Sequence, residues 1–387
     1  MRLFTKTKLL SFLLFLGTAY LRAQSAVFTS GNNNYSAFRI PAIITAPNGD
    51  LLAFCEGRVN NSGDFGNIDI VMKRSTDGGK NWSSIQVVVD ADSLQAGNPA
   101  PVVDLQDPEY PGGRIFLFYN TGNNHEGEVR KGNGERKVVF VASTDNGKTW
   151  GVPVDISEKT HRHGKAEDWR SYANTPGHAL QLERGKYKGR IYVAANHSEG
   201  APKSRFEYYR AHGFYSDDHG KTFSLSESVD FPGGNESTAA ELSDSRLMMN
   251  SRNQRGDKKM RIVSISEDGG NRWAFSFFDS TLIDPVCQGS ILNIGWKDNR
   301  AVLAFSNAAT PNRRDSLMVR VSVDEGITWK YSLLIDHDPD KKKDHTAYSD
   351  LVLVNKKTLG VLYERNGYKE ILFQTIQLKK DFQPWKK

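Results

Sequence analysis

Five short segments of this 387-residue chain share one pattern, Ser-x-Asp-x-Gly-x-x-aromatic. The copies begin at Ser75, Ser143, Ser216, Ser266 and Ser322. In each copy the aspartate can accept hydrogen bonds from its own turn, and the glycine supplies the positive φ that a tight hairpin needs. A stretch rich in strand formers precedes each copy, so each is predicted to be the tip of a β-hairpin. The five copies favour a folding role, because one active site does not need five equivalent aspartates.

The spacing of the copies predicts the architecture. Their starts lie about 62 residues apart on average, and six units of that length fill residues 24–387. Four strands of ordinary length with their loops fill one unit. Helical repeats are excluded because the units lack long 3.6-residue periodicity, whereas strand formers dominate 114–120, 190–196, 301–307 and 317–323. The chain is therefore predicted to be all-β, a six-bladed β-propeller of four-stranded antiparallel sheets.

The first 23 residues are predicted to be a signal peptide. Arg2, Lys6 and Lys8 precede an apolar run over 9–19, and Ala23 is a small residue suited to cleavage. The run is too short for a membrane span, which needs about 20 residues. We therefore expect a mature domain over 24–387 that is exported, either to a periplasm or out of the cell. Cleavage lowers the formal net charge from +6 to +2, so the charge does not favour a nucleic-acid partner.

The cysteines and histidines of the chain do not form a recognisable metal site or disulfide framework. Two cysteines, Cys55 and Cys287, cannot build a disulfide scaffold or a cysteine zinc cage. They are expected to be buried free thiols, although export would permit a bond between them. The group around His161 and His163 fits no standard metal-ligand spacing and is expected to be a solvated loop. No metal or organic cofactor is predicted, and the chain is expected to be a monomer.

Several arginines stand beside strand patterns, where an ordinary core residue would be expected. Arg39 sits within Phe38-Arg39-Ile40-Pro41, and Arg252 sits within Asn-Ser-Arg-Asn over 250–253. Arg313 and Arg314 precede the strand pattern that starts at 317. Arginines from different blades of a propeller can converge on one carboxylate, which guanidinium groups bind in a planar, bidentate way. Taken alone, each arginine would be expected to form a surface salt bridge.

The Phe-Arg-Ile-Pro segment, together with the five Ser-x-Asp-x-Gly-x-x-aromatic motifs (Asp boxes), resembles the exo-alpha-sialidases (neuraminidases) of the bacterial and animal type. The resemblance covers about residues 35–378. It implies a sialidase catalytic domain in which Arg39, Arg252 and Arg314 clamp the carboxylate of sialic acid. Arg314 is preferred to its neighbour Arg313 because its distance from Leu317 matches the family.

The same resemblance implies three catalytic residues. Asp64, in the loop before the first Asp box, matches the acid/base aspartate. Tyr348, in Ala-Tyr-Ser-Asp-Leu over 347–351, matches the nucleophile. Glu236 matches the partner of that tyrosine, with Glu241 as the alternative.

Three further matches concern substrate contacts and support. Arg58 resembles an arginine beside the sugar, and Asn98 resembles a residue on the 4-hydroxyl and acetamido side of the sugar. The family often has an aspartate where Asn98 stands. Glu364 resembles a glutamate that holds Arg39 in place.

The chemistry of sialic acid explains why a tyrosine suits this reaction. The sugar carries a carboxylate on the attacked carbon, and a neutral phenol avoids the repulsion that a carboxylate nucleophile would meet. The predicted function is therefore a retaining exo-alpha-sialidase, a glycoside hydrolase that acts on sialylated glycans, glycoproteins or glycolipids. The alternatives are a trans-sialidase, an anhydro-forming sialidase and a non-catalytic Asp-box propeller that binds carbohydrate.

Overall fold

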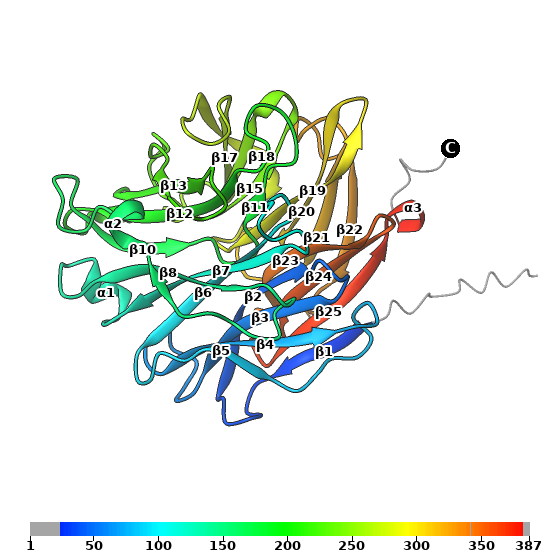
Figure 1. The fold of residues 1–387 in the computed structure, drawn as a ribbon, viewed down its shortest axis with the longest axis horizontal. Helices are drawn as coiled ribbons and strands as arrows, with labels where there is room; N and C mark the ends of the chain where they lie inside the picture. Colours follow the sequence, from blue (N-terminus) through cyan, green and yellow to red (C-terminus); the bar gives the residue numbers. More distant parts are fainter. Residues whose placement is uncertain (1–23, 341, 382–387) are drawn as a thin grey trace, which may run out of the picture.

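The computed structural model describes residues 24–340 and 342–381, so the predicted signal peptide over 1–23 lies outside the described residues. Within the described ranges the chain is almost entirely strands and loops (Figure 1). Its helices are single turns: α1 (Glu126–Val129), α2 (Ser157–Thr160) and α3 (Leu378–Asp381), with 3₁₀ turns at Ser204–Phe206 and Ser243–Ser245. None of the helices in the described part is long and apolar enough to cross a membrane.

Three antiparallel sheets have four strands each. The first contains β15 (Gly234–Glu241), β16 (Leu247–Asn253), β17 (Met260–Ser266) and β18 (Phe275–Ile283). The second contains β19 (Gly289–Lys297), β20 (Arg300–Ala308), β21 (Leu317–Ser322) and β22 (Tyr331–Asp336). The third joins the two ends of the described chain, because β1 (Gln24–Thr29) pairs with β25 (Glu370–Gln377) beside β24 (Thr358–Arg365) and β23 (Thr346–Asn355).

Two larger sheets complete the fold. A five-stranded sheet contains β10 (Trp169–Asn174), β11 (Leu180–Gln181), β12 (Ile191–Glu199), β13 (Tyr209–Ser216) and β14 (Ser224–Leu225). An eight-stranded sheet contains β2 (Ala37–Thr45), β3 (Leu51–Arg58), β4 (Ile68–Ser75), β5 (Gln86–Val89), β6 (Gln95–Asp104), β7 (Arg114–Gly122), β8 (Arg136–Ser143) and β9 (Val154–Asp155). The sheets lie around a common centre, as in a propeller (Figure 1).

The propeller class is confirmed, but the prediction of six separate four-stranded sheets differs from what the described residues form. Their hydrogen bonds make five sheets, of which three have four strands. The difference arises because β4 and β6 meet at one parallel residue pair, Ile68 with Gln95, which merges two groups of strands into one sheet. The sheet with five strands arises because β10 and β11 both pair with β12.

The five repeated motifs form hairpin tips, as predicted. Each begins at the last residue of the third strand in its group: β4, β8, β13, β17 and β21. In the first copy the Ser75 hydroxyl donates to Asp77 at 2.8 Å and accepts from the backbone N–H of Gly79 at 2.8 Å. Hydrogen bonds from Asn81 and Ser75 lower the pKa of Asp77 to about 2, so the carboxylate is a stable acceptor. Gly79 has φ +90°, which explains why this position favours glycine.

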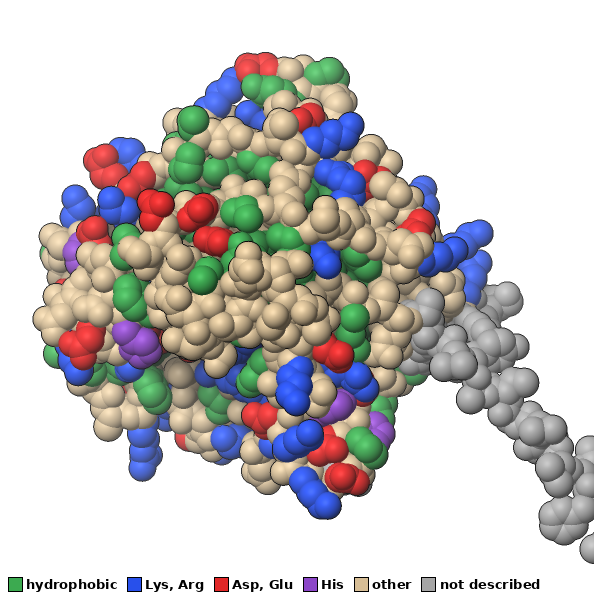
Figure 2. Space-filling view, turned by 90° about the horizontal axis from the view of Figure 1, so that it is seen from below, with side chains coloured by type: hydrophobic (Ala, Val, Ile, Leu, Met, Phe, Trp, Pro, Cys, Tyr) green, Lys and Arg blue, Asp and Glu red, His purple; other side chains and the backbone are tan. Residues whose placement is uncertain are grey.

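Apolar side chains of neighbouring strands and groups of strands form the core. The buried cluster around Phe54, for example, spans strands β2 to β8 and includes Leu117. The surface carries charged side chains together with some exposed hydrophobic ones (Figure 2). On the face in Figure 2, basic and acidic side chains are interspersed rather than separated by sign.

Candidate active site

Most of the predicted site residues line one cavity of about 240 Å³. Eight of the nine line it: Arg39, Arg58, Asp64, Asn98, Glu236, Arg252, Arg314 and Tyr348. They belong to β2, β3, β6, β15, β16 and β23 and to the loops 59–67 and 309–316, so the fold joins residues that lie far apart in sequence. The ninth, Glu364, is fully buried and contacts Arg39 behind the cavity wall.

Local irregularities in the strands aim several of these side chains. Register shifts interrupt the pairing of β2 between Arg39 and Ala42, of β6 between Gly97 and Ala100, of β15 between Gly234 and Ser237, and of β23 between Thr346 and Ser349. Asn98, Glu236 and Tyr348 lie within these bulges, and Arg39 borders one. Because a bulge bends its strand and re-aims a side chain, it turns these groups out of the regular alternation. Ile40 and Asn98 accordingly have φ of +60° and +54°.

The three predicted carboxylate-binding arginines surround Tyr348. The guanidinium carbons of Arg39 and Arg314 lie 5.6 and 5.4 Å from the centre of the Tyr348 ring. Arg252 Nη1 donates to the Tyr348 hydroxyl at 3.1 Å. Arg313, the alternative to Arg314, pairs with Asp315 at 2.9 Å and does not line the cavity.

Tyr348 and Glu236 form a direct hydrogen bond. The phenol donates to Glu236 Oε1 at 2.5 Å, and the other oxygen of Glu236 accepts from Arg252 at 2.6 Å. Glu236 is therefore held by one donor on each oxygen. A carboxylate in this position can take the phenol proton.

The pKa of Tyr348 lies well above its ordinary value. Burial and the Glu236 carboxylate raise this pKa, while Arg252 and Arg314 lower it. The positive charges of the two arginines favour the ionised phenol, but burial and Glu236 outweigh them. The phenol is therefore neutral in the resting protein and needs a base when it reacts.

Glu364 holds two parts of the site together, as the resemblance implied. Its Oε1 accepts from Arg39 Nε at 2.7 Å and from the backbone N–H of Ile40 at 2.9 Å. Its Oε2 accepts from the backbone N–H of Tyr348 at 3.1 Å. One buried carboxylate thus fixes both Arg39 and the backbone of Tyr348.

Asp64 and Arg58 form an ion pair at the mouth of the cavity. Arg58 Nη1 lies 2.7 Å from Asp64 Oδ1, and the Asp64 side chain is 71% exposed. Burial raises the pKa of Asp64, but the charge and hydrogen bond of Arg58 outweigh it and hold this pKa below the usual range. Arg58 is positioned from behind by Glu56, which accepts from Arg58 Nη2 at 2.7 Å and from the backbone N–H of Asn98 at 2.9 Å.

Two residues of the site were missed by the sequence analysis. Glu56 is buried and orients Arg58; its place two residues before Arg58, on the same face of β3, is a signal that could have found it. Tyr368 lies under Arg39 at 4.0 Å and accepts a hydrogen bond from Arg314 at 3.2 Å. No motif marks Tyr368, because its contacts with the two arginines depend on how the turn between β24 and β25 folds.

Glu241, the alternative partner for Tyr348, lies elsewhere. It accepts from the backbone N–H groups of Glu183 and Arg184, both at 2.8 Å. It borders a second cavity of about 370 Å³ rather than the one that holds Tyr348. The structure therefore favours Glu236 over Glu241.

A buried carboxylate two residues after Tyr348 accepts hydrogen bonds from distant parts of the chain. Asp350 is fully buried and accepts from the Ser290 hydroxyl at 2.8 Å, from the backbone N–H of Ile43 at 2.8 Å and from His178 Nδ1 at 2.7 Å. Burial lowers the pKa of His178, but Asp350 outweighs burial and raises it. These donors come from three separate parts of the chain.

Asp350→Ala is expected to lower the free energy of unfolding by about 3–5 kcal/mol, because it leaves several buried donors without an acceptor. Chemical denaturation followed by tryptophan fluorescence measures this change. Asp230→Ala, at an exposed aspartate, is the control and should stay within about 0.5 kcal/mol of the parent. A loss below about 1 kcal/mol for Asp350→Ala would show that the group does not stabilise the propeller.

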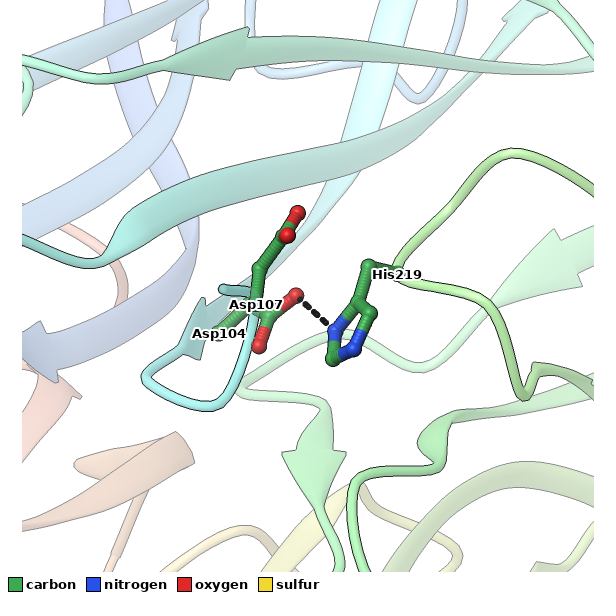
Figure 3. A group of neighbouring side chains, drawn as sticks. All are labelled: Asp104, Asp107 and His219. Carbon is green, nitrogen blue, oxygen red and sulfur yellow. Dashed lines mark hydrogen bonds and ion pairs between the residues drawn. The ribbon is translucent and has the colours of Figure 1, made fainter. Parts of the chain in front are cut away.

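A cluster of two aspartates and one histidine has the composition of a metal site (Figure 3). His219 Nδ1 lies 2.9 Å from one oxygen of Asp104, and the other oxygen accepts from Gln181 at 2.6 Å. Asp107 accepts from Arg114 at 2.8 Å and from the backbone N–H of Glu109 at 2.9 Å. All four carboxylate oxygens thus already have protein partners, which fits a hydrogen-bond network between loops better than a cation site.

The thiol and histidine-loop predictions have different outcomes. Cys55 and Cys287 are buried and free, as expected, and Cys287 packs with Ile40 and Tyr348. The loop 162–168 is exposed as expected, but His161 is buried. Burial and the nearby His163 lower the pKa of His161 to about 3, so it is a neutral packing residue.

Comparison with known sequences finds one matching family and several similar proteins named as sialidases. A family described as BNR repeat-like domain matches residues 49–361. A sialidase of Micromonospora viridifaciens is 33% identical over 365 residues, which cover 89% of this chain and 52% of the relative. An exo-alpha-sialidase of Arthroderma benhamiae is 30% identical over 366 residues, which cover 87% of this chain and 80% of the relative.

Solved structures agree with the sequence comparison. The fold resembles a Hadza microbial sialidase, Hz136, with a TM-score of 0.77 and 26% identity over 92% of this chain and 68% of that chain. It also resembles a leech intramolecular trans-sialidase with a TM-score of 0.72, where 17% identity shows the fold alone. The chain spans 52% of the Micromonospora sialidase and 64% of a Bacteroides fragilis sialidase. The match over residues 49–361 and the identity to the Arthroderma enzyme show that this chain belongs to the sialidase family and carries its BNR repeat-like domain.

Proposed function

We propose that the protein is a retaining exo-alpha-sialidase that releases terminal sialic acid from glycans, glycoproteins or glycolipids. One observation carries the proposal: the Tyr348 hydroxyl donates to Glu236 at 2.5 Å and accepts from Arg252 at 3.1 Å, with Arg39 and Arg314 5.6 and 5.4 Å from the centre of its ring. A binding module needs no base beside a buried phenol, and a glycosidase that uses two carboxylates needs no such group of arginines.

The first half of the reaction forms a covalent intermediate. Arg39, Arg252 and Arg314 bind the substrate carboxylate and fix the ring. The Tyr348 oxygen attacks the anomeric carbon while Glu236 takes the phenol proton. The bond to the leaving glycan oxygen breaks, and Asp64 gives that oxygen a proton.

The second half returns the enzyme to its starting state. Asp64, now a carboxylate, takes a proton from a water that attacks the anomeric carbon. The Tyr348 oxygen leaves and recovers its proton from Glu236. Two displacements at one carbon give net retention. No step requires a metal or an organic cofactor.

The proposal also includes the number of blades in the propeller. The eight-stranded sheet is joined only at Ile68 and Gln95 between its two antiparallel halves, and treating these halves as separate blades gives six blades.

Export, with residues 1–23 removed as a signal peptide, would bring the enzyme to glycans outside the cytoplasm. N-terminal sequencing of the exported protein tests the cleavage site, and sedimentation tests the expected monomer.

Release of free sugar tests the proposed activity. Purified residues 24–387 are incubated with 3′-sialyllactose and, separately, with 6′-sialyllactose, and the products are separated by chromatography. Free sialic acid and lactose are expected. A sugar transferred to added lactose, or an anhydro product, would keep the site but change the reaction. Absence of any product from folded protein, with retained binding, would favour the carbohydrate-binding alternative.

The third arginine can be tested with adjacent residues. Arg314→Ala should weaken binding of a 2,3-unsaturated sialic acid analogue at least about tenfold, because it removes a charge-assisted contact to the carboxylate. Arg313→Ala, at a residue that pairs with Asp315 outside the cavity, should change this affinity by less than about twofold. Titration calorimetry gives both values. The reverse pattern would assign the role to Arg313.

A further inference from the structure

A strained loop lies behind two of the residues that line the cavity. The loop covers 284–288, between the end of β18 and the start of β19. Val286 in this loop has φ +67°, a value that a β-branched residue rarely adopts. Such strain persists only where the surrounding structure enforces it, and it recurs at functional sites.

The middle of the loop contacts Arg314 and Tyr348. The Val286 carbonyl accepts a hydrogen bond from Arg314 Nη2 at 3.4 Å. Cys287, the next residue, packs with Tyr348 in one buried cluster. The position of this backbone therefore affects where the Arg314 guanidinium and the Tyr348 ring lie.

The last residue of the loop binds the strand that carries Tyr348. Gln288 Oε1 accepts from the backbone N–H of Ser349 at 3.0 Å, and Gln288 Nε2 donates to the Ser349 carbonyl at 3.1 Å. Ser349 directly follows Tyr348 in β23. The loop and the backbone of Tyr348 are thus joined by hydrogen bonds as well as by packing.

Two buried charged side chains hold the loop from behind. Asp284 Oδ1 accepts from the backbone N–H groups of Val286 at 2.8 Å and Cys287 at 2.9 Å. Asp284 Oδ2 lies 3.0 Å from Arg261 Nη1, which also donates to the Cys287 carbonyl at 2.5 Å. Arg261 and Asp284 are 0% and 1% exposed, and neither lines the cavity. This ion pair therefore enforces the strained backbone at Val286.

The other side of the Arg261 guanidinium binds β16, the strand that carries Arg252. Its Nε donates to Asn250 Oδ1 at 2.6 Å, and its Nη2 donates to the Asn250 carbonyl at 3.2 Å. Asn250 is fully buried and lies two residues before Arg252. One planar guanidinium with fixed geometry thus joins the strand of Arg252 to the loop that contacts Arg314.

We propose that Arg261, together with Asp284, is a positioning residue for the substrate carboxylate: it fixes the loop 284–288 relative to β16 and so places Arg314 against Arg252. Arg261 does not touch the substrate and acts only through these arginines. A lysine in its place keeps the charge opposite Asp284, but a single ammonium lacks the planar fork that binds β16 and the loop together. The inference rests on the proposed function, because it explains how the arginines that would bind the carboxylate are held.

A double-mutant cycle with Arg314 tests this role, with titration calorimetry of the 2,3-unsaturated sialic acid analogue as the measurement. Arg261→Lys should weaken binding at least about fivefold in the otherwise wild-type protein and less than about twofold in the Arg314→Ala background. In the Arg313→Ala background the full loss should remain, since Arg313 lies outside the cavity. Unchanged affinity of Arg261→Lys, or an equal loss with and without Arg314, would overturn the proposal, because a general loosening of the fold does not depend on Arg314.

Two further variants separate positioning from stability. Asp284→Asn keeps an acceptor for the N–H groups of the loop but removes the charge that faces Arg261, so it should repeat the loss and its dependence on Arg314. Arg190→Lys is the matched control: Arg190 is 4% exposed and binds Asp217 through Nε and Nη2, both at 2.7 Å, away from the cavity. It should lower the thermal stability but change the affinity for the analogue by less than about twofold. An equal loss of affinity in Arg190→Lys and Arg261→Lys would also overturn the proposal.

Turnover is measured separately, so this inference and the proposed function can fail independently. If no sialyllactose is cleaved but the affinities for the analogue depend on Arg261 and Arg314 jointly, the proposed function fails and the positioning role stands. If sialyllactose is cleaved and the Arg261→Lys loss is the same in both backgrounds, the function stands and the positioning role fails.

Discussion

Replacing Tyr348 by phenylalanine is expected to leave the fold intact and to lower kcat by at least about 10³-fold. The ring packs against Ile40, Cys287 and Ala347, and phenylalanine keeps all of these contacts. The substitution removes only the oxygen that donates to Glu236 at 2.5 Å. Without that oxygen no covalent intermediate can form, so the loss should appear in kcat and much less in the affinity for a sialic acid analogue.

A second buried tyrosine provides the control for this variant. Tyr363 donates its hydroxyl to Asp336 at 2.9 Å, outside the cavity. Tyr363→Phe should lose some stability but keep kcat within about twofold, because no reacting group is touched. Initial rates on sialyllactose and circular dichroism of each variant give both quantities. Near-normal turnover by Tyr348→Phe would remove Tyr348 from the reaction.

The second large effect is expected for Asp64→Asn and should depend on the leaving group. An amide cannot protonate the departing oxygen, so kcat/KM on sialyllactose should fall by about 10²–10⁴-fold. An aryl glycoside with an acidic phenol needs little protonation, so its kcat/KM should fall by less than about tenfold. Asp69→Asn is the matched control, since Asp69 accepts from Tyr35 at 2.6 Å and does not line the cavity. Equal losses on both substrates would contradict the assignment of Asp64 as the acid.

The same residue predicts the pH dependence. Arg58 holds the pKa of Asp64 below its usual range, so the carboxyl loses its proton at a lower pH than an ordinary aspartate does. A general acid acts in its protonated form. For sialyllactose kcat/KM should therefore be highest in acid and should decline as the pH rises through this pKa. With the aryl glycoside the decline should be much weaker, and equal profiles for the two substrates would contradict this explanation.

The repeated motifs made the fold class predictable, because each motif fixes a hairpin tip by its own serine, aspartate and glycine. The same local logic did not predict how neighbouring groups of strands join. The contact between Ile68 and Gln95 depends on how the chain after β5 returns to the start of β4, and no motif specifies it. That one pair accounts for the merged sheet, which the spacing of the motifs could not foresee.

Residues of the site were predictable where a short motif surrounds them, as for Arg39, Arg252 and Tyr348. Glu56 and Tyr368 carry no such motif, and their roles follow from side chains that meet only in the folded chain. The effect on Tyr348 was also only partly predictable. Its ionisation depends on a balance between burial, Glu236 and two arginines, and that balance requires the geometry.

The central claim is that Tyr348 attacks the anomeric carbon and that the reaction retains configuration. Proton NMR of the protein acting on sialyllactose tests it most directly, with the wild type beside Tyr348→Phe, because the anomers of free sialic acid give separate signals. We predict that the α anomer appears first, converts slowly to the β anomer, and is absent with the variant. Initial release of the β anomer, or equal release by Tyr348→Phe, would contradict the account.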